Sequence, residues 1–108
     1  MMKRGDLISV AIPGDYGKPR PALIIQSDRT SYLDSITVLP LTSGELNADD
    51  FRIGILPSIE NGLIHFSYVM VDKAGTIRRT KAGPVIGRIT DNEMADVNRA
   101  LAAFLGFA

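Results

Sequence analysis

The sequence contains no cysteine, no tryptophan and a single histidine, His65. Without cysteine the chain has neither a disulfide framework nor a thiolate zinc site, and one histidine argues against a histidine-rich metal site. No apolar run approaches the roughly 20 residues that span a membrane. Residues 1–6 also lack the long apolar core of a signal peptide. We therefore expect a cytoplasmic protein without a metal or other cofactor.

The chain has no net charge either, because 12 lysines and arginines balance 12 aspartates and glutamates. This balance argues against a general coat for nucleic acid. The charges are nevertheless unevenly placed, since residues 73–90 hold only basic charges and residues 45–60 are mainly acidic. The asymmetry is compatible with one basic face for a polyanion, and equally with a solvated turn rich in lysine and arginine.

Short β-strand patterns fill most of the sequence, and at 108 residues we expect one domain, 1–108. Apolar residues predict strands at 7–12, 22–25, 35–41, 51–56, 63–72 and 85–89, with a further short strand around Ile77. The pattern at 7–12 favours one fully buried face, and that at 22–25 favours a central strand covered on both. Pro40 is expected at a strand end or edge because it has no N–H. Gly54 is expected to mark a bulge.

The periodicity changes near the C-terminus, where Thr90 and Glu93 form a capping-box pattern that predicts the start of a helix. Apolar residues then recur at helical spacing and are expected to be core: Met94, Val97, Leu101, Phe104 and Leu105. Gly106 suits the C-terminal cap. The whole pattern predicts a mainly β fold with a C-terminal helix, in which five to seven short, mostly antiparallel strands form a compact sheet or small barrel.

Arg20 is the first candidate functional residue, because it lies between Pro19 and Pro21 at the start of an apolar run. Each proline has a fixed φ and pushes the residue before it into extended geometry. The guanidinium therefore has a well-defined position at a strand end, and its planar fork suits phosphate or carboxylate. The alternative is that Arg20 is simply a solvated strand end.

Several segments, taken in order, give the sequence a family resemblance: Arg4-Gly5-Asp6, Arg20-Pro21-Ala22-Leu23-Ile24, Pro40-Leu41-Thr42-Ser43, Ser67-Tyr68-Val69-Met70-Val71-Asp72 and Ile86-Gly87-Arg88-Ile89 before the final helix. Together they make the chain similar to the MazF/PemK toxins over nearly its whole length. The resemblance implies a small CcdB-like barrel and a homodimer. It also implies metal-free cleavage of single-stranded RNA and neutralisation by a cognate antitoxin.

The resemblance assigns catalytic roles to three residues. Arg20 would hold the phosphate oxygens as charge accumulates, and the Thr42 hydroxyl would bond the phosphate or orient the 2′-hydroxyl. Asp72 aligns with a carboxylate that can act as general base. The alternatives are that Thr42 is a turn former, and that Asp72 closes a turn or pairs with a nearby arginine.

Further RNA contacts are expected from Ser43 as a second donor, from Tyr16 by stacking on a base, and from Lys18, His65 and Arg79. His65 is expected in a strand, on the same face as Ser67. The sequence departs from some family members in two ways, since Met70 stands where they carry an arginine and the loop 13–19 is short and has no histidine. A mechanism that needs either group is therefore not expected here.

Two non-enzymatic alternatives remain on the same fold. A gyrase poison resembling CcdB depends on a C-terminal tail with tryptophan, whereas this chain ends Leu105-Gly106-Phe107-Ala108. A degenerate member would be retained only to bind antitoxin or to regulate its operon. The leading hypothesis is a toxin of a toxin–antitoxin pair that cleaves RNA, with a sequence preference that the residues do not reveal.

Overall fold

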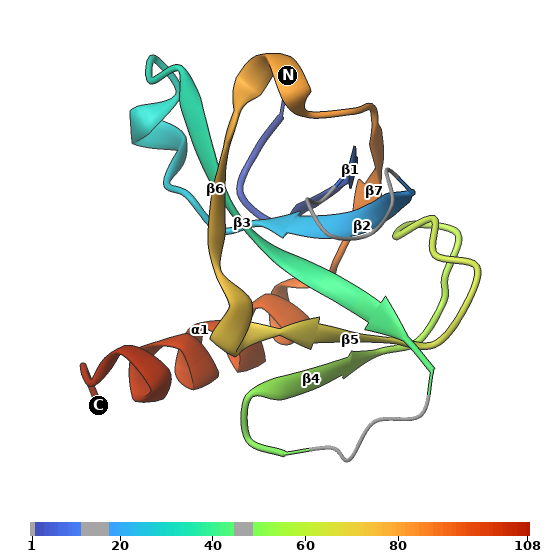
Figure 1. Cartoon of the computed structure of the whole chain (residues 1–108). Coiled ribbons are helices and arrows are strands. Elements are labelled where there is room, and N and C mark those ends of the chain that lie inside the picture. Colours follow the sequence, from blue (N-terminus) through green and yellow to red (C-terminus); the bar gives the residue numbers. More distant parts are fainter. Residues whose placement is uncertain (1, 12–17, 45–48) are drawn as a thin grey trace.

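The computed structural model describes residues 2–11, 18–44 and 49–108. The described part contains seven strands and one α-helix: β1 (Asp6–Ala11), β2 (Pro19–Ile24), β3 (Ser35–Ser43), β4 (Arg52–Ile55), β5 (Ser67–Met70), β6 (Gly75–Arg78), β7 (Val85–Arg88) and α1 (Asp91–Leu105) (Figure 1). Three short 3₁₀ helices lie at Asp28–Thr30, Val71–Lys73 and Arg79–Lys81. The prediction of a mainly β fold with a C-terminal helix is confirmed, and no described helix is long and apolar enough to cross a membrane. The predicted loop at 13–17 and Tyr16 lie outside the described residues.

The long strand β3 connects the two parts of the sheet. The strands follow the order β4-β5-β3-β2-β1-β7, all paired antiparallel, and β6 pairs with the first half of β3. The last three residues of β3 pair with β5 instead. In Figure 1, β3 runs across the molecule, with β1, β2 and β7 on one side of it and β4, β5 and α1 below. The strands therefore form a half-barrel whose two parts share one strand.

Side chains alternate between two apolar cores on opposite faces of β1, β2 and β3. The first core lies under α1 and contains Leu7, Leu23, Leu39, Leu41, Ile55, Leu63, Val69, Val71, Ile89, Val97 and Ala100. The second core contains Ile8, Val10, Ala22, Ile24, Ile36 and Val38. The predicted central strand with two covered faces is therefore confirmed in β2. The predicted buried face of β1 is confirmed by Ile8 and Val10 of the second core, and at the start of the strand Leu7 is buried as well, in the first core.

Helix α1 begins and ends where the sequence predicts. The Glu93 N–H donates to Thr90 Oγ1 at 3.0 Å, and the Thr90 N–H donates to the Glu93 carboxylate at 2.8 Å. Gly106 ends the helix in the left-handed conformation. The prediction of a buried last turn is wrong, because the side chains of Phe104 and Leu105 are 43% and 52% exposed. The reason is that this turn reaches the sheet only at its edge, where the Phe104 ring meets that of Phe51.

Pro40 lies inside β3, opposite Ala22, so its predicted place at a strand end or edge is wrong. The Ile25 N–H donates to the Thr37 carbonyl at 3.2 Å, which shows that the backbone groups of odd-numbered β3 residues face β2. The Pro40 nitrogen therefore faces the other edge of β3. On that edge pairing with β6 ends at Val38 and pairing with β5 begins at Leu41. A residue without an N–H fits this change of partner, because no ladder bond is lost.

Two further expectations about the β4–β5 region are wrong. Gly54 pairs with Tyr68 in regular register and forms no bulge. A Cβ at residue 54 would lie 2.6 Å from the Phe66 ring, so a larger residue there would displace this ring. The strand predicted at 63–72 is shorter, since β5 begins at Ser67 and leaves His65 in the preceding bend. In this bend the Ser67 hydroxyl donates to the His65 carbonyl at 2.9 Å, a local bond that replaces strand pairing.

Candidate functional site

Strands β2 and β3 separate at one end of the sheet. They are paired from Ile24–Val38 to Ala22–Pro40, beyond which β3 pairs with β5 and the first half of β2 pairs with β1 alone. The backbone bond from Ile25 to β3 shows that odd-numbered β2 residues face β3, so the nitrogens of Pro19 and Pro21 face this separation. Neither proline has an N–H to satisfy there. The two prolines thus make the separation possible without leaving a donor unpaired.

Arg20 and Thr42 occupy corresponding positions on the two separating strands. Each lies two residues beyond the Ala22–Pro40 pair, and each alternates with residues of the first core, so their side chains share the opposite sheet face. Both residues are partly exposed, so neither is sealed in the protein. The Thr42 hydroxyl lies 3.4 Å from the Ser43 carbonyl oxygen, a long contact that leaves it able to turn towards a ligand.

Asp72 follows β5 in a 3₁₀ helix and forms an ion pair with Arg52 of β4, while Lys73 Nζ lies 3.9 Å from its other oxygen. Arg52 of β4 is directly opposite Met70 of β5. Met70 is the position at which, by the family resemblance, some members carry an arginine. A guanidinium therefore reaches Asp72 from the neighbouring strand. Pairing of Asp72 with an arginine was one of the alternatives in the sequence, but the sequence does not identify Arg52 as the partner, because this depends on the register between β4 and β5.

Tyr68 lies in β5, between Thr42 of β3 and Gly54 of β4. It pairs with Thr42 on one side and with Gly54 on the other, so its ring stands on the sheet face of Thr42. The Phe66 ring lies over Gly54 and makes an edge-to-face contact with Tyr68 at 5.1 Å. Alternation along β4 places Arg52 on this face too. The face thus carries hydroxyl, aromatic and guanidinium groups together with Asp72, although Asp72 lies beyond the far end of β5 from Thr42 and is not in contact with it.

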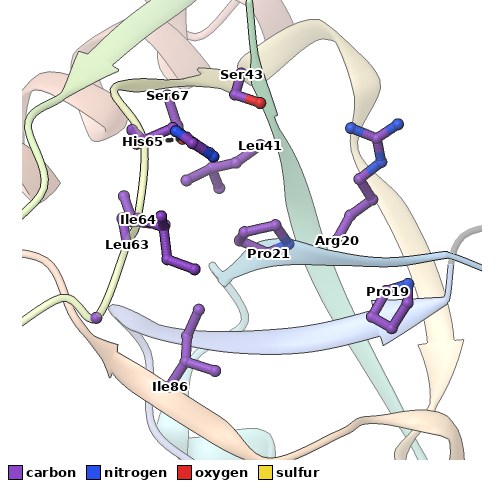
Figure 2. Close-up of a pocket in the computed structure, with 11 residues that line it drawn as sticks. Pro19, Arg20, Pro21, Leu41, Ser43, Leu63, Ile64, His65, Ser67 and Ile86 are labelled. Carbon is purple, nitrogen blue, oxygen red and sulfur yellow. Dashed lines mark hydrogen bonds between the residues drawn. The ribbon is translucent and has the colours of Figure 1, made fainter.

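A cavity of about 330 Å³ opens between the separating strands, at the end of the first core. It is lined by Pro19, Arg20, Pro21, Leu41, Ser43, Gly62, Leu63, Ile64, His65, Ser67 and Ile86. In Figure 2, Ser43, His65 and Leu41 lie on one side of β3, and the Arg20 guanidinium extends on the other. The structure therefore brings Ser43 and His65 together with Ser67, as the sequence suggested for the last two, but on the face opposite Thr42.

The remaining predicted contacts lie apart from this region or beyond the description. Arg79 Nε donates to the Leu33 carbonyl at 2.6 Å, near the start of β3 rather than its end. Arg88 of the same basic stretch pairs with Asp6 at 2.8 Å. Lys18 is exposed just before β2, close to Arg20 in the chain. Among the residues that the structure describes, no group of three or more His, Asp or Glu side chains is placed to hold a metal ion.

Comparison with known proteins gives a consistent result. A model of the family described as "PemK-like, MazF-like toxin of type II toxin-antitoxin system" matches residues 3–105. The chain is 43% identical to the protein named "Probable endoribonuclease MazF" from Mycolicibacterium smegmatis, over 99% of both chains.

Solved structures share the fold. An endoribonuclease in complex with its cognate antitoxin from a mycobacterial species has a TM-score of 0.84 at 23% identity, over 100% of this chain and 98% of that one. A MazE-MazF structure from Deinococcus radiodurans has a TM-score of 0.78 at 19% identity, over 99% and 98%. The Mycobacterium tuberculosis toxin MazF-mt6 has a TM-score of 0.77 at 24% identity, over 93% and 96%.

Proposed function

The chain belongs to the PemK-like, MazF-like toxins of type II toxin–antitoxin systems, and we infer from this membership that it is an endoribonuclease. The enzyme is favoured over a non-catalytic CcdB-like binding protein, because the relative of 43% identity is named as an endoribonuclease. The structural observation that carries the proposal is the shared sheet face of Arg20 and Thr42 at the separated ends of β2 and β3. Its substrate is single-stranded RNA, and its place of action is the cytoplasm.

The proposed reaction uses the RNA's own 2′-hydroxyl as the nucleophile. The 2′-oxygen forms a bond to phosphorus, the bond from phosphorus to the 5′-oxygen breaks, and the products are a 2′,3′-cyclic phosphate and a 5′-hydroxyl. One proton passes from the 2′-hydroxyl to the general base proposed below, and the 5′-oxygen takes one from solvent water. Arg20 donates to the phosphate oxygens while negative charge builds on them, and Thr42 donates to the same phosphate or orients the 2′-hydroxyl. No step requires a metal.

We propose Asp72 as the acceptor of the 2′-hydroxyl proton on the family resemblance alone. Because Asp72 follows Tyr68, the β5 partner of Thr42, by four residues, this role requires that RNA binding bring Asp72 and the phosphate together. Its ion pair with Arg52 supports a joint role, in which the guanidinium binds RNA phosphate and the released carboxylate takes the proton. The competing interpretation is that the pair only fixes the 3₁₀ helix after β5. The assignment therefore depends on whether Asp72 can leave Arg52 when RNA binds.

Further contacts and partners complete the proposal. Lys18, Ser43, His65 and Tyr16 would contact RNA around the cut. For Arg79, the bond to the Leu33 carbonyl favours a structural role instead. We propose that the protein acts as a homodimer, as the family resemblance implies. We also propose that a cognate antitoxin neutralises it, since structures that share its fold are described as complexes with an antitoxin or with MazE.

The proposal is tested by incubating the purified protein with a mixed RNA pool in the presence of a chelator. We expect cut ends that carry 5′-hydroxyl and cyclic phosphate groups, read by sequencing. Arg20→Ala should lower the single-turnover rate about 10²–10³-fold, as loss of a preorganised donor does. Arg29→Ala, in the exposed Asp28–Thr30 helix, is the matched control and should leave the rate unchanged.

Intact RNA after prolonged incubation with the wild type would contradict the enzyme proposal and favour a protein that only binds antitoxin. In the same assay, Asp72→Asn tests the proton acceptor. A rate reduced about 10²-fold or more with unchanged RNA binding supports that role. A wild-type rate in this variant assigns Asp72 to the fold.

A further inference from the structure

The cavity between β2 and β3 has apolar walls that no proposed catalytic step uses. Pro21 of β2, Leu63 and Ile86 are among the residues that form its sides, and its volume of about 330 Å³ is in the range of small-ligand pockets. The walls come from several parts of the chain and meet only because β2 and β3 diverge. The cavity thus follows from the divergence of the two strands, and the segment before β5 closes one side of it.

The wall contributed by residues 56–63 is held in place by Asn61, a buried polar residue. Its Oδ1 accepts from the N–H groups of Ser58 and Leu63, both at 2.9 Å, and its Nδ2 donates to the Leu56 carbonyl at 2.8 Å. Gly62 follows with a φ of +70°, and a Cβ there would lie 2.1 Å from the Ile86 carbonyl oxygen. These bonds and this close approach fix the wall before any ligand arrives, which lowers the entropy cost of binding.

Polar groups stand at the rim of the cavity, over apolar walls. The Ser43 hydroxyl and the His65 imidazole both line it and are exposed. The backbone of His65 is held through its carbonyl, which accepts from the Ser67 hydroxyl at 2.9 Å. Beyond Pro40, the edge of β3 that carries the backbone groups of Leu41 and Ser43 has no paired strand among the described residues. The site therefore combines flat apolar packing with donors and acceptors along one side.

We propose that this cavity binds one unpaired nucleobase of the RNA, next to the phosphate held by Arg20 and Thr42, and that Ser43 and His65 recognise the polar edge of that base. Thr42 and Ser43 are consecutive residues at the end of β3, one on each sheet face. RNA that passes around this strand end can place a phosphate at Thr42 and an adjoining base at Ser43. The inference rests on the proposed function, and it assigns the sequence preference to a specific place.

A nucleobase fits the observations better than an aliphatic side chain of another protein. The faces of a base pack on proline and aliphatic walls, and its edge carries hydrogen-bonding groups that Ser43 and His65 can meet. An aliphatic side chain would use the walls but leave both polar groups without a role. Ile64, which is 85% exposed beside the cavity, would be covered by either occupant and does not distinguish them.

The experiment measures binding of a single-stranded oligonucleotide that carries a 2′-deoxy residue at the cut position, so that cleavage is blocked. The base at each neighbouring position is removed in turn to give an abasic series. We expect one position at which removal weakens wild-type binding about tenfold or more, in line with the discrimination that a base-edge contact supplies. His65→Ala and Ser43→Ala should weaken binding of the intact oligonucleotide but not of the oligonucleotide abasic at that position.

Ile59→Ala is the matched control, because Ile59 is exposed in the same 56–66 segment and does not line the cavity. It should behave as wild type with every oligonucleotide. A second measurement compares cleavage of substrates that differ only in the base at this position, where His65→Ala should reduce the preferred-to-next ratio of kcat/KM about tenfold.

Identical abasic profiles for wild type, His65→Ala and Ser43→Ala would overturn the inference. If the same variants instead weaken antitoxin binding or self-association, the cavity belongs to a protein interface and the inference is again wrong. If the enzyme proposal itself is wrong, the outcome is different. The 2′-deoxy oligonucleotide and the unmodified RNA then bind equally and no cut ends form. The binding of the abasic series still shows whether the cavity holds a base.

Discussion

The two halves of β3 contain similar residues but differ in how their edges are paired. In the first half, Ile36 and Val38 are buried between β2 and β6, and the Thr37 N–H donates to the Gln26 side chain at 2.9 Å. Beyond Pro40, β3 is paired with β5 alone among the described strands, and its edge towards β2 is open. Polar side chains near the fully paired half satisfy the fold. Those at the open half are available to a ligand.

Two arginines also differ in where they lie in the sheet. Arg79, beside the paired half, donates to a backbone carbonyl of the loop before β3. Arg20 lies where β2 has left β3, beside a cavity and on the face of Thr42. A basic residue in this sequence is therefore informative about RNA only when its position in the sheet is known.

The largest expected effect is a difference in cleavage rate between two variants in which one of the two threonines of β3 is replaced by valine. Thr42→Val should lower the single-turnover rate of RNA cleavage about 10²-fold, because it removes the hydroxyl that we propose as a donor to the phosphate. Thr37→Val removes the 3.1 Å contact with the Thr76 hydroxyl and should leave the rate unchanged. The two variants carry the same chemical change on one strand. Equal rates for both would remove the distinction between the halves.

The next effect concerns the stability of the open half. Gly54→Ala places a methyl group 2.6 Å from the Phe66 ring, so this ring must move off β4 and its contact with Tyr68 is disturbed. We expect a loss of about 1–3 kcal/mol in the free energy of unfolding, as for other overpacked sites. Urea unfolding followed by circular dichroism measures it. Gly44→Ala, with open space around its Cβ position but a φ of +116°, shows the cost of backbone strain alone.

The smallest effect is expected at the paired half. Arg79→Ala removes a charged donor to the Leu33 carbonyl and should destabilise the protein by about 1–2 kcal/mol. Thermal unfolding should register a Tm lower by several degrees, while the cleavage rate per folded molecule stays the same. A variant with normal Tm and slower cleavage would contradict the structural role and support an RNA contact by Arg79.

Local signals in the sequence were reliable where the cause was local. The capping box at Thr90 and Glu93 predicted the start of α1, and the apolar run after Arg20 predicted a strand covered on both faces. Signals that depend on neighbours misled. Phe104 has helical core spacing but reaches only the sheet edge, and the apolar residues at 63–66 continue a strand pattern for which β4 supplies no partner.

The candidate site divides in the same way. Arg20, Thr42 and Asp72 could be named from the sequence because their motifs resemble a family. The partner of Asp72 could not, because Arg52 is brought opposite Met70 by strand register. The sequence also could not predict that Ser43 and His65 lie on the sheet face opposite Thr42. This arrangement follows from alternation along β3 and from the bend before β5.

The sequence by itself determined the family, the helix with its caps, and the strand that follows Pro19 and Pro21, because fixed φ angles, missing N–H groups and capping side chains act within a few residues. The tertiary structure alone decided which strand follows β3 on each edge, and hence where a cavity opens and which side chains share a face. Pairing between distant strands sets these outcomes, and the free energy of that pairing belongs to the whole sheet rather than to any segment of it.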